Sequence, residues 1–186
     1  MAIIYQANIV PTKAELVAAW LPKQPWFDGQ ATQLNPIGSY RFDDPVGEVG
    51  MEAHLFAAGQ RLVHVPLTYR AAPLDGAEEW LVGTMEHSVL GTRWVYDGPG
   101  DPVFRTELTR VILDADTQVE QIVHTPEGPV TREPTMWVRG SGASRNPAEG
   151  IVVVRDPRRA PARPAGPALT GTWGDRDEPA VLAYLA

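Results

Sequence analysis

The sequence predicts an α+β fold: a mainly antiparallel sheet or partly closed barrel with one short N-terminal helix and one long amphipathic helix packed on it. Three observations support this prediction. Short strand-like segments are separated by Gly, Pro and Asp at hairpin spacing, a capped helical pattern follows the first of them, and a long helical pattern lies past the middle of the chain. The 186 residues suffice for one domain with a sizeable core.

The first element is a β-rich segment at residues 2–10, which leads into the short helix. Thr12 and Glu15 have the spacing of a capping box, so the helix is predicted to begin there. Its apolar stripe is Leu16, Ala19 and Trp20. Pro22 then ends the helix, because proline lacks the amide hydrogen that a helix interior needs.

Five strands are predicted next, at residues 36–42, 47–56, 60–70, 79–87 and 90–96. Apolar residues alternate along both strands of the second hairpin. A three-residue loop with Gly59 in the left-handed conformation pairs Ala53 with Val63 and so brings the apolar faces together. Met51 then pairs with Val65. We predict this register because a two-residue loop would mismatch the apolar faces.

The long helix is predicted to start at Asp101 and Pro102, as the N-cap and the first helical residue. Its apolar stripe has three- and four-residue spacing: Phe104, Leu108, Val111, Ile112, Ala115, Val119 and Ile122. Four more strand-like segments follow, at 134–139, 151–155, 169–173 and 181–185. We expect them to extend the sheet or to close it into a barrel.

Charge and composition exclude several classes of function. The net charge of −7 argues against general affinity for nucleic acid, and the absence of cysteine excludes disulfides, thiolate zinc sites and thiol nucleophiles. The N-terminus has no signal pattern and no apolar run approaches about 18 residues, so we expect a cytoplasmic protein that does not bind membranes. The Pro- and Arg-rich segment 156–164 reads as an extended surface connection, with an anion site as the alternative.

Several aromatic and proline positions occur in a telling order: Trp20-Leu21-Pro22, Trp26-Phe27, Val65-Pro66-Leu67-Thr68-Tyr69-Arg70, Val95-Tyr96-Asp97 and Asp101-Pro102. This order resembles the N-terminal cap domain of actinobacterial maltokinases over roughly residues 1–120. We therefore expect a cap-like α+β region at 1–125 and a C-terminal β extension at 126–186 in the same domain. Maltokinases phosphorylate maltose with a catalytic core that follows the cap. The resemblance implies a free-standing cap-like module linked to maltose, trehalose or glycogen metabolism.

No complete catalytic constellation is recognisable. Phosphoryl transfer needs a metal-binding aspartate, a carboxylate base and a phosphate-binding loop or lysine, and the only lysines, Lys13 and Lys23, lie in or beside the first helix. There is also no Gly-x-Ser-x-Gly elbow. We expect a binding or accessory module without catalytic residues or a cofactor, whose partner is a protein or a sugar-related small molecule. The oligomeric state stays open.

Two alternatives come from other classes. A small-molecule-binding barrel would have a pocket lined by aromatic residues: Trp80, Trp94, Trp137 and Trp173. A metal-dependent enzyme would use the second hairpin, where the predicted register places Glu52 opposite His64, with His54 on the same face. Two imidazoles and a carboxylate suit zinc or non-haem iron. The simpler interpretation is an ion pair on a half-exposed sheet face.

Two further patterns are interpreted as structural. Asp116, Glu120 and His124 would share one face of the long helix if it extended that far, and we interpret them as a solvated helix end. Residues 140–145 begin like a dinucleotide-binding fingerprint, but the third glycine is missing and Asn146-Pro147 follows. We interpret that segment as a mobile loop.

Overall fold

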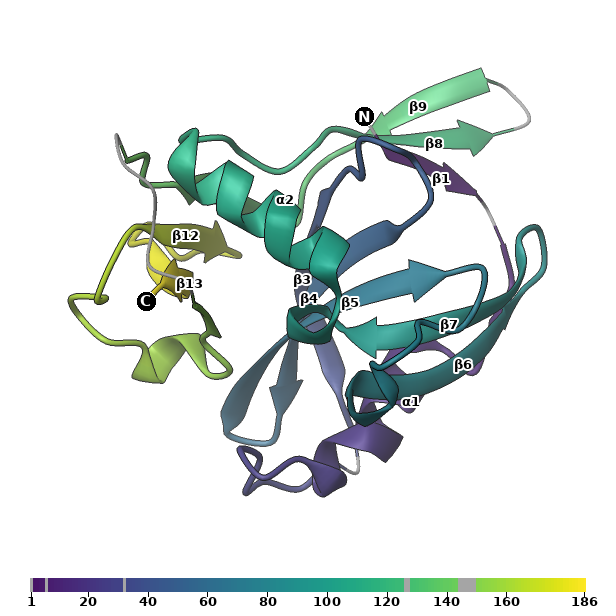
Figure 1. The fold of residues 1–186 in the computed structure, drawn as a ribbon, viewed down its shortest axis with the longest axis horizontal. Coiled ribbons are helices and arrows are strands. Elements are labelled where there is room, and N and C mark those ends of the chain that lie inside the picture. Colours follow the sequence, from purple (N-terminus) through teal and green to yellow (C-terminus); the bar gives the residue numbers. More distant parts are fainter. Residues whose placement is uncertain (1, 6, 32, 126–127, 144–149) are drawn as a thin grey trace.

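The computed structural model describes the chain except residues 1, 6, 32, 126–127 and 144–149 (Figure 1). Its largest sheet has six antiparallel strands in the spatial order β2 (Ile9–Val10), β6 (Leu81–His87), β7 (Gly91–Asp97), β5 (Arg61–Arg70), β4 (Gly50–Ala58) and β3 (Asn35–Phe42). A four-stranded antiparallel sheet has the order β10 (Met136–Gly140), β12 (Ala168–Trp173), β13 (Ala180–Leu185) and β11 (Ile151–Val153).

A three-stranded sheet completes the β structure: β1 (Ala2–Tyr5), β8 (Gln121–Thr125) and β9 (Gly128–Arg132). The α-helices are α1 (Lys13–Trp20) and α2 (Pro102–Leu113), and the 3-10 turns are η1 (Leu21–Lys23), η2 (Glu78–Trp80), η3 (Gly98–Gly100) and η4 (Pro157–Arg159). The prediction of mainly antiparallel strands is confirmed. The strands form three sheets rather than one, and the predicted strand at 2–10 divides into β1 and β2, which belong to different sheets.

Both helices start where the sequence predicts. The Thr12 hydroxyl accepts a hydrogen bond from the Glu15 amide at 3.3 Å, and the Glu15 carboxylate accepts one from the Thr12 amide at 2.8 Å. These two bonds form the predicted capping box of α1. The Asp101 carboxylate likewise accepts a hydrogen bond from the Val103 amide at 2.9 Å and caps α2.

Helix α2 is shorter than predicted, and this changes the interpretation of the residues after it. The backbone turns left-handed at Ala115, with φ of 55°, and the Asp116 amide donates to the Val111 carbonyl, five residues back. Such a turn ends a helix. Asp116 and Glu120 therefore lie outside α2, and His124 belongs to β8, so the three residues share no helix face.

The predicted register of the β4–β5 hairpin is wrong. The turn has two residues, Gly59 and Gln60, and Ala53 lies opposite Pro66 rather than Val63. The prediction assumed that only one face of these strands is apolar, whereas every residue of β4 from Met51 to Phe56 is buried. Since both faces pack against other elements, matching apolar faces could not decide the register.

The two faces of the six-stranded sheet belong to two different cores. On one face, residues of β3 and β4 pack against α2 and the four-stranded sheet, including Tyr40, Met51, Leu55, Phe104, Ile112 and Leu182. Figure 1 shows α2 lying between the two sheets. The other face packs against α1 and the segment after it, including Val17, Trp20, Leu21, Phe56, Val65 and Val95. Among the described residues, no helix is both long and apolar enough to cross a membrane.

Candidate functional site

A pocket of about 530 Å³ opens beside the start of α1, between β3 and the β6–β7 turn. Three cationic and three acidic side chains line its wall beside Tyr69 and His87: Lys13, Arg41, Arg93, Asp43, Asp44 and Glu48. Its apolar part includes Phe42, Val49, Met51, Met85 and Leu90. We call this site the charged pocket. A cavity of this size, with an apolar part and a few polar groups, is typical of a small-molecule site.

A buried carboxylate holds two of the cations in place. Glu52 of β4 is only 6% exposed, and its Oε2 contacts the Lys13 ammonium and lies 2.9 Å from an Arg41 guanidinium nitrogen. Burial alone would raise the pKa of the Glu52 carboxyl, but the neighbouring His54, Lys13 and Arg41 outweigh burial and hold that pKa well below its usual value. Glu52 is therefore ionised, and it positions the cations at the edge of the pocket.

His54 and Tyr69 lie beside Glu52, behind the cations of the charged pocket. The His54 Nε2 lies 3.1 Å from the Tyr69 hydroxyl and 3.7 Å from the Glu52 carboxylate, and the imidazole stacks on Phe56. Burial lowers the pKa of His54 to about 4, so its ring is neutral at pH 7. The Lys13 ammonium also lies 5.5 Å from the centre of the Tyr69 ring. Glu52, His54 and Tyr69 thus form a connected polar network, in which the His54 ring stacks on Phe56.

The predicted grouping of Glu52, His54 and His64 does not form. Glu52 lies opposite Leu67 and His54 opposite Val65, so both project from the face that carries those residues. His64 projects from the other face, because neighbouring strand residues point in opposite directions. Its Nε2 lies 3.0 Å from the Tyr40 hydroxyl and its Nδ1 3.1 Å from the Val154 carbonyl. Within the described part of the chain, no three His, Asp or Glu side chains are placed to hold a metal.

The four tryptophans of the predicted barrel pocket are dispersed. Trp80 lies on η2 and Trp94 on β7, whereas Trp137 is 49% exposed on β10 and Trp173 is buried in the core. None of them lines the charged pocket. Gly140 ends β10, and Ser144 to Pro147 of the predicted loop lie outside the described residues.

Sequence reasoning missed the cations of the charged pocket. Lys13 is the first residue of α1, Arg41 lies on β3 and Arg93 on β7, so only the fold brings them together. A partial signal was present in β3, since Arg41 follows the buried Tyr40 and must face the side that carries Glu52. Arg41 and Arg93 each have a buried Nε without a hydrogen-bond acceptor among the described residues.

The structure is an α+β fold of mainly antiparallel sheets, with a pocket of mixed polar and apolar lining beside the six-stranded sheet. Residues 20–101 match the family model described as the maltokinase N-terminal cap domain. The resemblance predicted from the sequence is confirmed over this segment, which runs from the last residue of α1 to the N-cap of α2. No curated protein matches the chain.

Proposed function

We propose that the protein is a non-catalytic module that binds a small neutral sugar in the charged pocket. The observation that carries this proposal is the mixture of donors and acceptors on one wall. Lys13, Arg41 and Arg93 can only donate hydrogen bonds, whereas carboxylates such as Glu48 can only accept them. Every sugar hydroxyl both donates and accepts, so a polyhydroxyl ligand satisfies both kinds of group.

The balance of charge also favours a neutral ligand. Three cations face three carboxylates in the wall, and the buried Glu52 adds a fourth negative charge behind them. A free anion would gain little in such a site, because Lys13 and Arg41 already pair with Glu52. The apolar floor with Phe42 and Met85 suits the C–H faces of a pyranose ring.

The family match supports a particular class of sugar. The matched family is named for an enzyme that acts on maltose, and we therefore propose maltose or a related glucoside as the ligand. The proposed role is accessory to that metabolism in the cytoplasm. A reaction carried out by this chain is not part of the proposal.

Arg93→Ala tests the proposal. We choose Arg93 because Arg41 also holds the buried Glu52, so its removal would disturb the fold. Isothermal titration with maltose, trehalose and glucose should show saturable binding of at least one sugar. Loss of the Arg93 hydrogen bonds should raise the Kd about tenfold, as expected for a charged donor.

Arg139→Ala is the matched control, since Arg139 is exposed on β10, outside the charged pocket. This variant should bind the sugar as tightly as the parent chain. The proposal fails if none of the three sugars binds, or if both arginine variants weaken binding equally.

A further inference from the structure

A second pocket, of about 220 Å³, lies between β5 and the Pro- and Arg-rich segment. Its wall carries two aromatic rings, three arginines and one aspartate: Trp26, Phe27, Arg61, Arg155, Arg159 and Asp156. The segment is not extended where it begins. It forms η4, buries Pro157, and accepts a hydrogen bond at the Arg155 carbonyl from the His64 amide, at 2.8 Å. The chain is therefore held against β5 where this segment begins.

Arg155 is the structural member of this group. Its guanidinium forms two hydrogen bonds with the buried Asp97 carboxylate, one of them at 2.9 Å. It also lies 4.5 Å from the centre of the Trp26 ring, in cation–π geometry. With both contacts made, Arg155 positions the indole at the pocket and has little capacity left for a ligand.

Arg61 and Arg159 are less committed. Arg61 pairs with Asp28 at 2.7 Å, but the Asp28 side chain is 68% exposed, and such a surface pair contributes little. The Arg159 side chain is 67% exposed and its Nε lies 3.9 Å from the Asp156 carboxylate. That carboxylate already accepts two hydrogen bonds from the Arg158 guanidinium, each at 3.2 Å.

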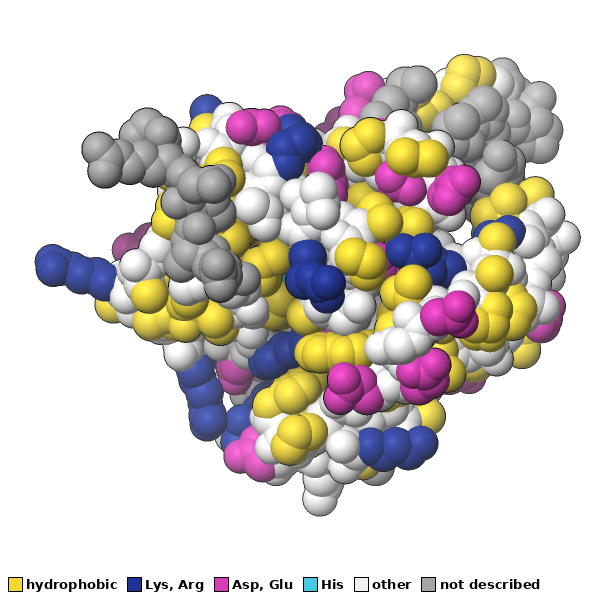
Figure 2. Space-filling view, viewed as in Figure 1, with side chains coloured by type: hydrophobic (Ala, Val, Ile, Leu, Met, Phe, Trp, Pro, Cys, Tyr) yellow, Lys and Arg dark blue, Asp and Glu magenta, His cyan; other side chains and the backbone are white. Residues whose placement is uncertain are grey.

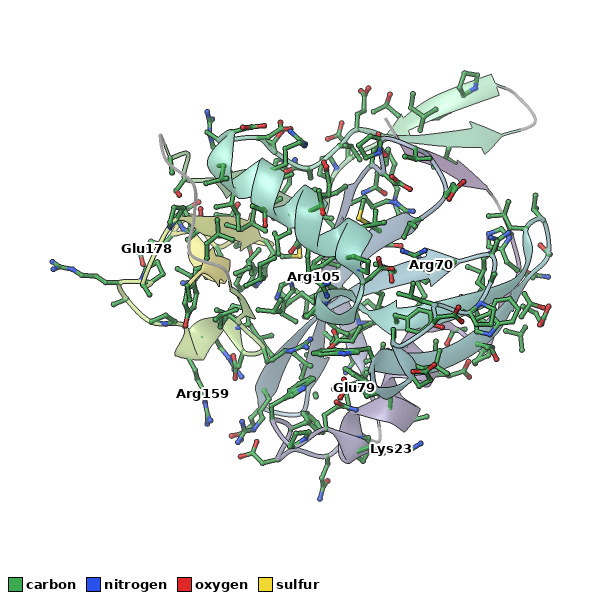
Figure 3. All side chains as sticks on the ribbon, in the orientation of Figure 1. Lys23, Arg70, Glu79, Arg105, Arg159 and Glu178 are labelled. Atoms are coloured by element: carbon green, nitrogen blue, oxygen red, sulfur yellow. The ribbon has the colours of Figure 1, made fainter. Side chains whose placement is uncertain are left out.

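The second pocket also lies in a positively charged region. Four arginines and three aspartates form the surrounding cluster, which leaves one excess positive charge: Arg61, Arg155, Arg158 and Arg159 with Asp28, Asp97 and Asp156. Figure 2 shows Lys and Arg side chains standing out at the lower left of the molecule, and Figure 3 places Arg159 there, projecting from η4. This charge contrasts with the negative charge of the whole chain.

We propose that the second pocket binds a phosphate monoester. Arg61 and Arg159 donate hydrogen bonds to the phosphate oxygens, since a guanidinium matches the geometry of a phosphate. The sugar or base attached to the phosphate contacts the partly exposed rings of Trp26 and Phe27. Sugar phosphates and nucleotides share this chemistry. The pocket is separate from the charged pocket, and the proposal does not depend on sugar binding there.

Nuclear magnetic resonance of the full chain tests this proposal through the Trp26 indole N–H, assigned by comparison with Trp26→Phe. Three probes are titrated separately: AMP, glucose 1-phosphate and inorganic phosphate. AMP or glucose 1-phosphate should shift the Trp26 signal saturably, and the tighter of the two identifies the source of the monoester. Arg159→Ala should raise the Kd about tenfold through the loss of one charge-assisted contact.

Arg163→Ala is the matched control, because Arg163 is exposed in the same Pro- and Arg-rich segment, carries the same charge and does not line the pocket. It should change the Kd by less than about twofold, as expected for an exposed charge. Equal weakening by Arg163→Ala and Arg159→Ala overturns the site, as does the absence of a shift with all three probes. If inorganic phosphate binds with the same affinity as both monoesters, the proposed contact of the sugar or base with Trp26 and Phe27 is overturned. Arg93→Ala should leave this titration unchanged, which separates it from sugar binding.

Discussion

At the scale of single residues, the two buried histidines contribute stability only while they are neutral. His64 is 1% exposed and lies between Tyr40 and the carbonyl of Val154, in the core that joins β5 to the C-terminal segment. Burial, with a smaller contribution from nearby Arg155 and His54, lowers the pKa of His64 to about 4, although the hydrogen bond to the Val154 carbonyl acts in the opposite direction. An imidazolium in this place would have no carboxylate partner among its hydrogen-bonding neighbours.

His64 should therefore make stability depend on pH. In the unfolded chain a histidine binds a proton near its ordinary pKa of about 6.5, whereas folded His64 binds one only near pH 4. The unfolded state thus takes up the proton first as pH falls. Between pH 7 and pH 5 this single group should lower the free energy of unfolding by about 2 kcal/mol.

Urea unfolding at both pH values, with the parent chain and His64→Gln, measures this contribution. His54 has a similarly low pKa and remains in both proteins, so some pH dependence should persist. The variant should be less stable at pH 7 but should lose less stability on acidification. An identical loss in the two proteins would contradict the assigned role of His64.

The sequence indicated part of this residue-level chemistry. Glu52 and His54 were expected on one face of the same strand, and the structure places them 3.7 Å apart. The position of His64 could not be predicted, because it depends on the hairpin register. Lys13 and Arg93 could not be predicted as neighbours either, since they are far apart in the chain and meet only through packing of α1 and β7 around the charged pocket.

At the scale of elements, α2 depends on a cap that is also a buried ion pair. Asp101 is fully buried, and besides capping α2 its two carboxylate oxygens accept hydrogen bonds from Arg70, each at 2.7 Å. Arg70, labelled in Figure 3, comes from the end of β5. Asp101, the N-cap of α2, therefore attaches the start of that helix to β5 of the six-stranded sheet.

Asp101→Ala should lower the free energy of unfolding by about 3–5 kcal/mol, because it removes the cap and leaves Arg70 without its partner. Chemical denaturation followed by circular dichroism measures this loss. Asp114→Ala, at the other end of α2, is the control, since its side chain is 61% exposed and should change stability by less than about 0.5 kcal/mol. Equal effects of the two substitutions would show that Asp101 does not have this double role.

Local sequence signals predicted where the elements begin better than where they end. Caps at Thr12 and Asp101 involve residues two or three positions apart, and both are present. The end of α2 depends on a left-handed Ala115, an uncommon conformation for a residue with a β-carbon. The apolar periodicity continued past that point, because residues of β8 also carry apolar side chains, and it was wrongly assigned to the helix.

At the scale of the whole molecule, the four-stranded sheet is joined to α2 by close backbone contact. A β-carbon added at Gly140 would lie 2.0 Å from the Val111 carbonyl oxygen and 2.7 Å from the Ile112 Cα. Both contacts are with helical backbone, which cannot move aside as a flexible side chain would. β10 thus approaches α2 at a distance that only glycine permits.

Gly140→Ala should therefore destabilise the molecule by about 3 kcal/mol or more, because α2 and β10 must separate. Gly50→Ala is the matched control in another strand, since its added β-carbon would meet Tyr69 at an ordinary 3.5 Å. That substitution should change stability by less than about 1 kcal/mol. Thermal denaturation compares the two variants. Similar melting temperatures would mean that the α2–β10 contact adjusts without cost.

The matched segment, residues 20–101, does not cover one face of its own sheet. The segment supplies Tyr40, Met51 and Leu55 to one core, but the residues that cover them, such as Phe104 and Leu182, lie beyond it. A protein that carries this segment in another setting must therefore provide its own apolar layer for that face of the sheet. Such a layer has to match that face in shape and apolar character, whereas the segment itself does not dictate the topology of the elements that supply it.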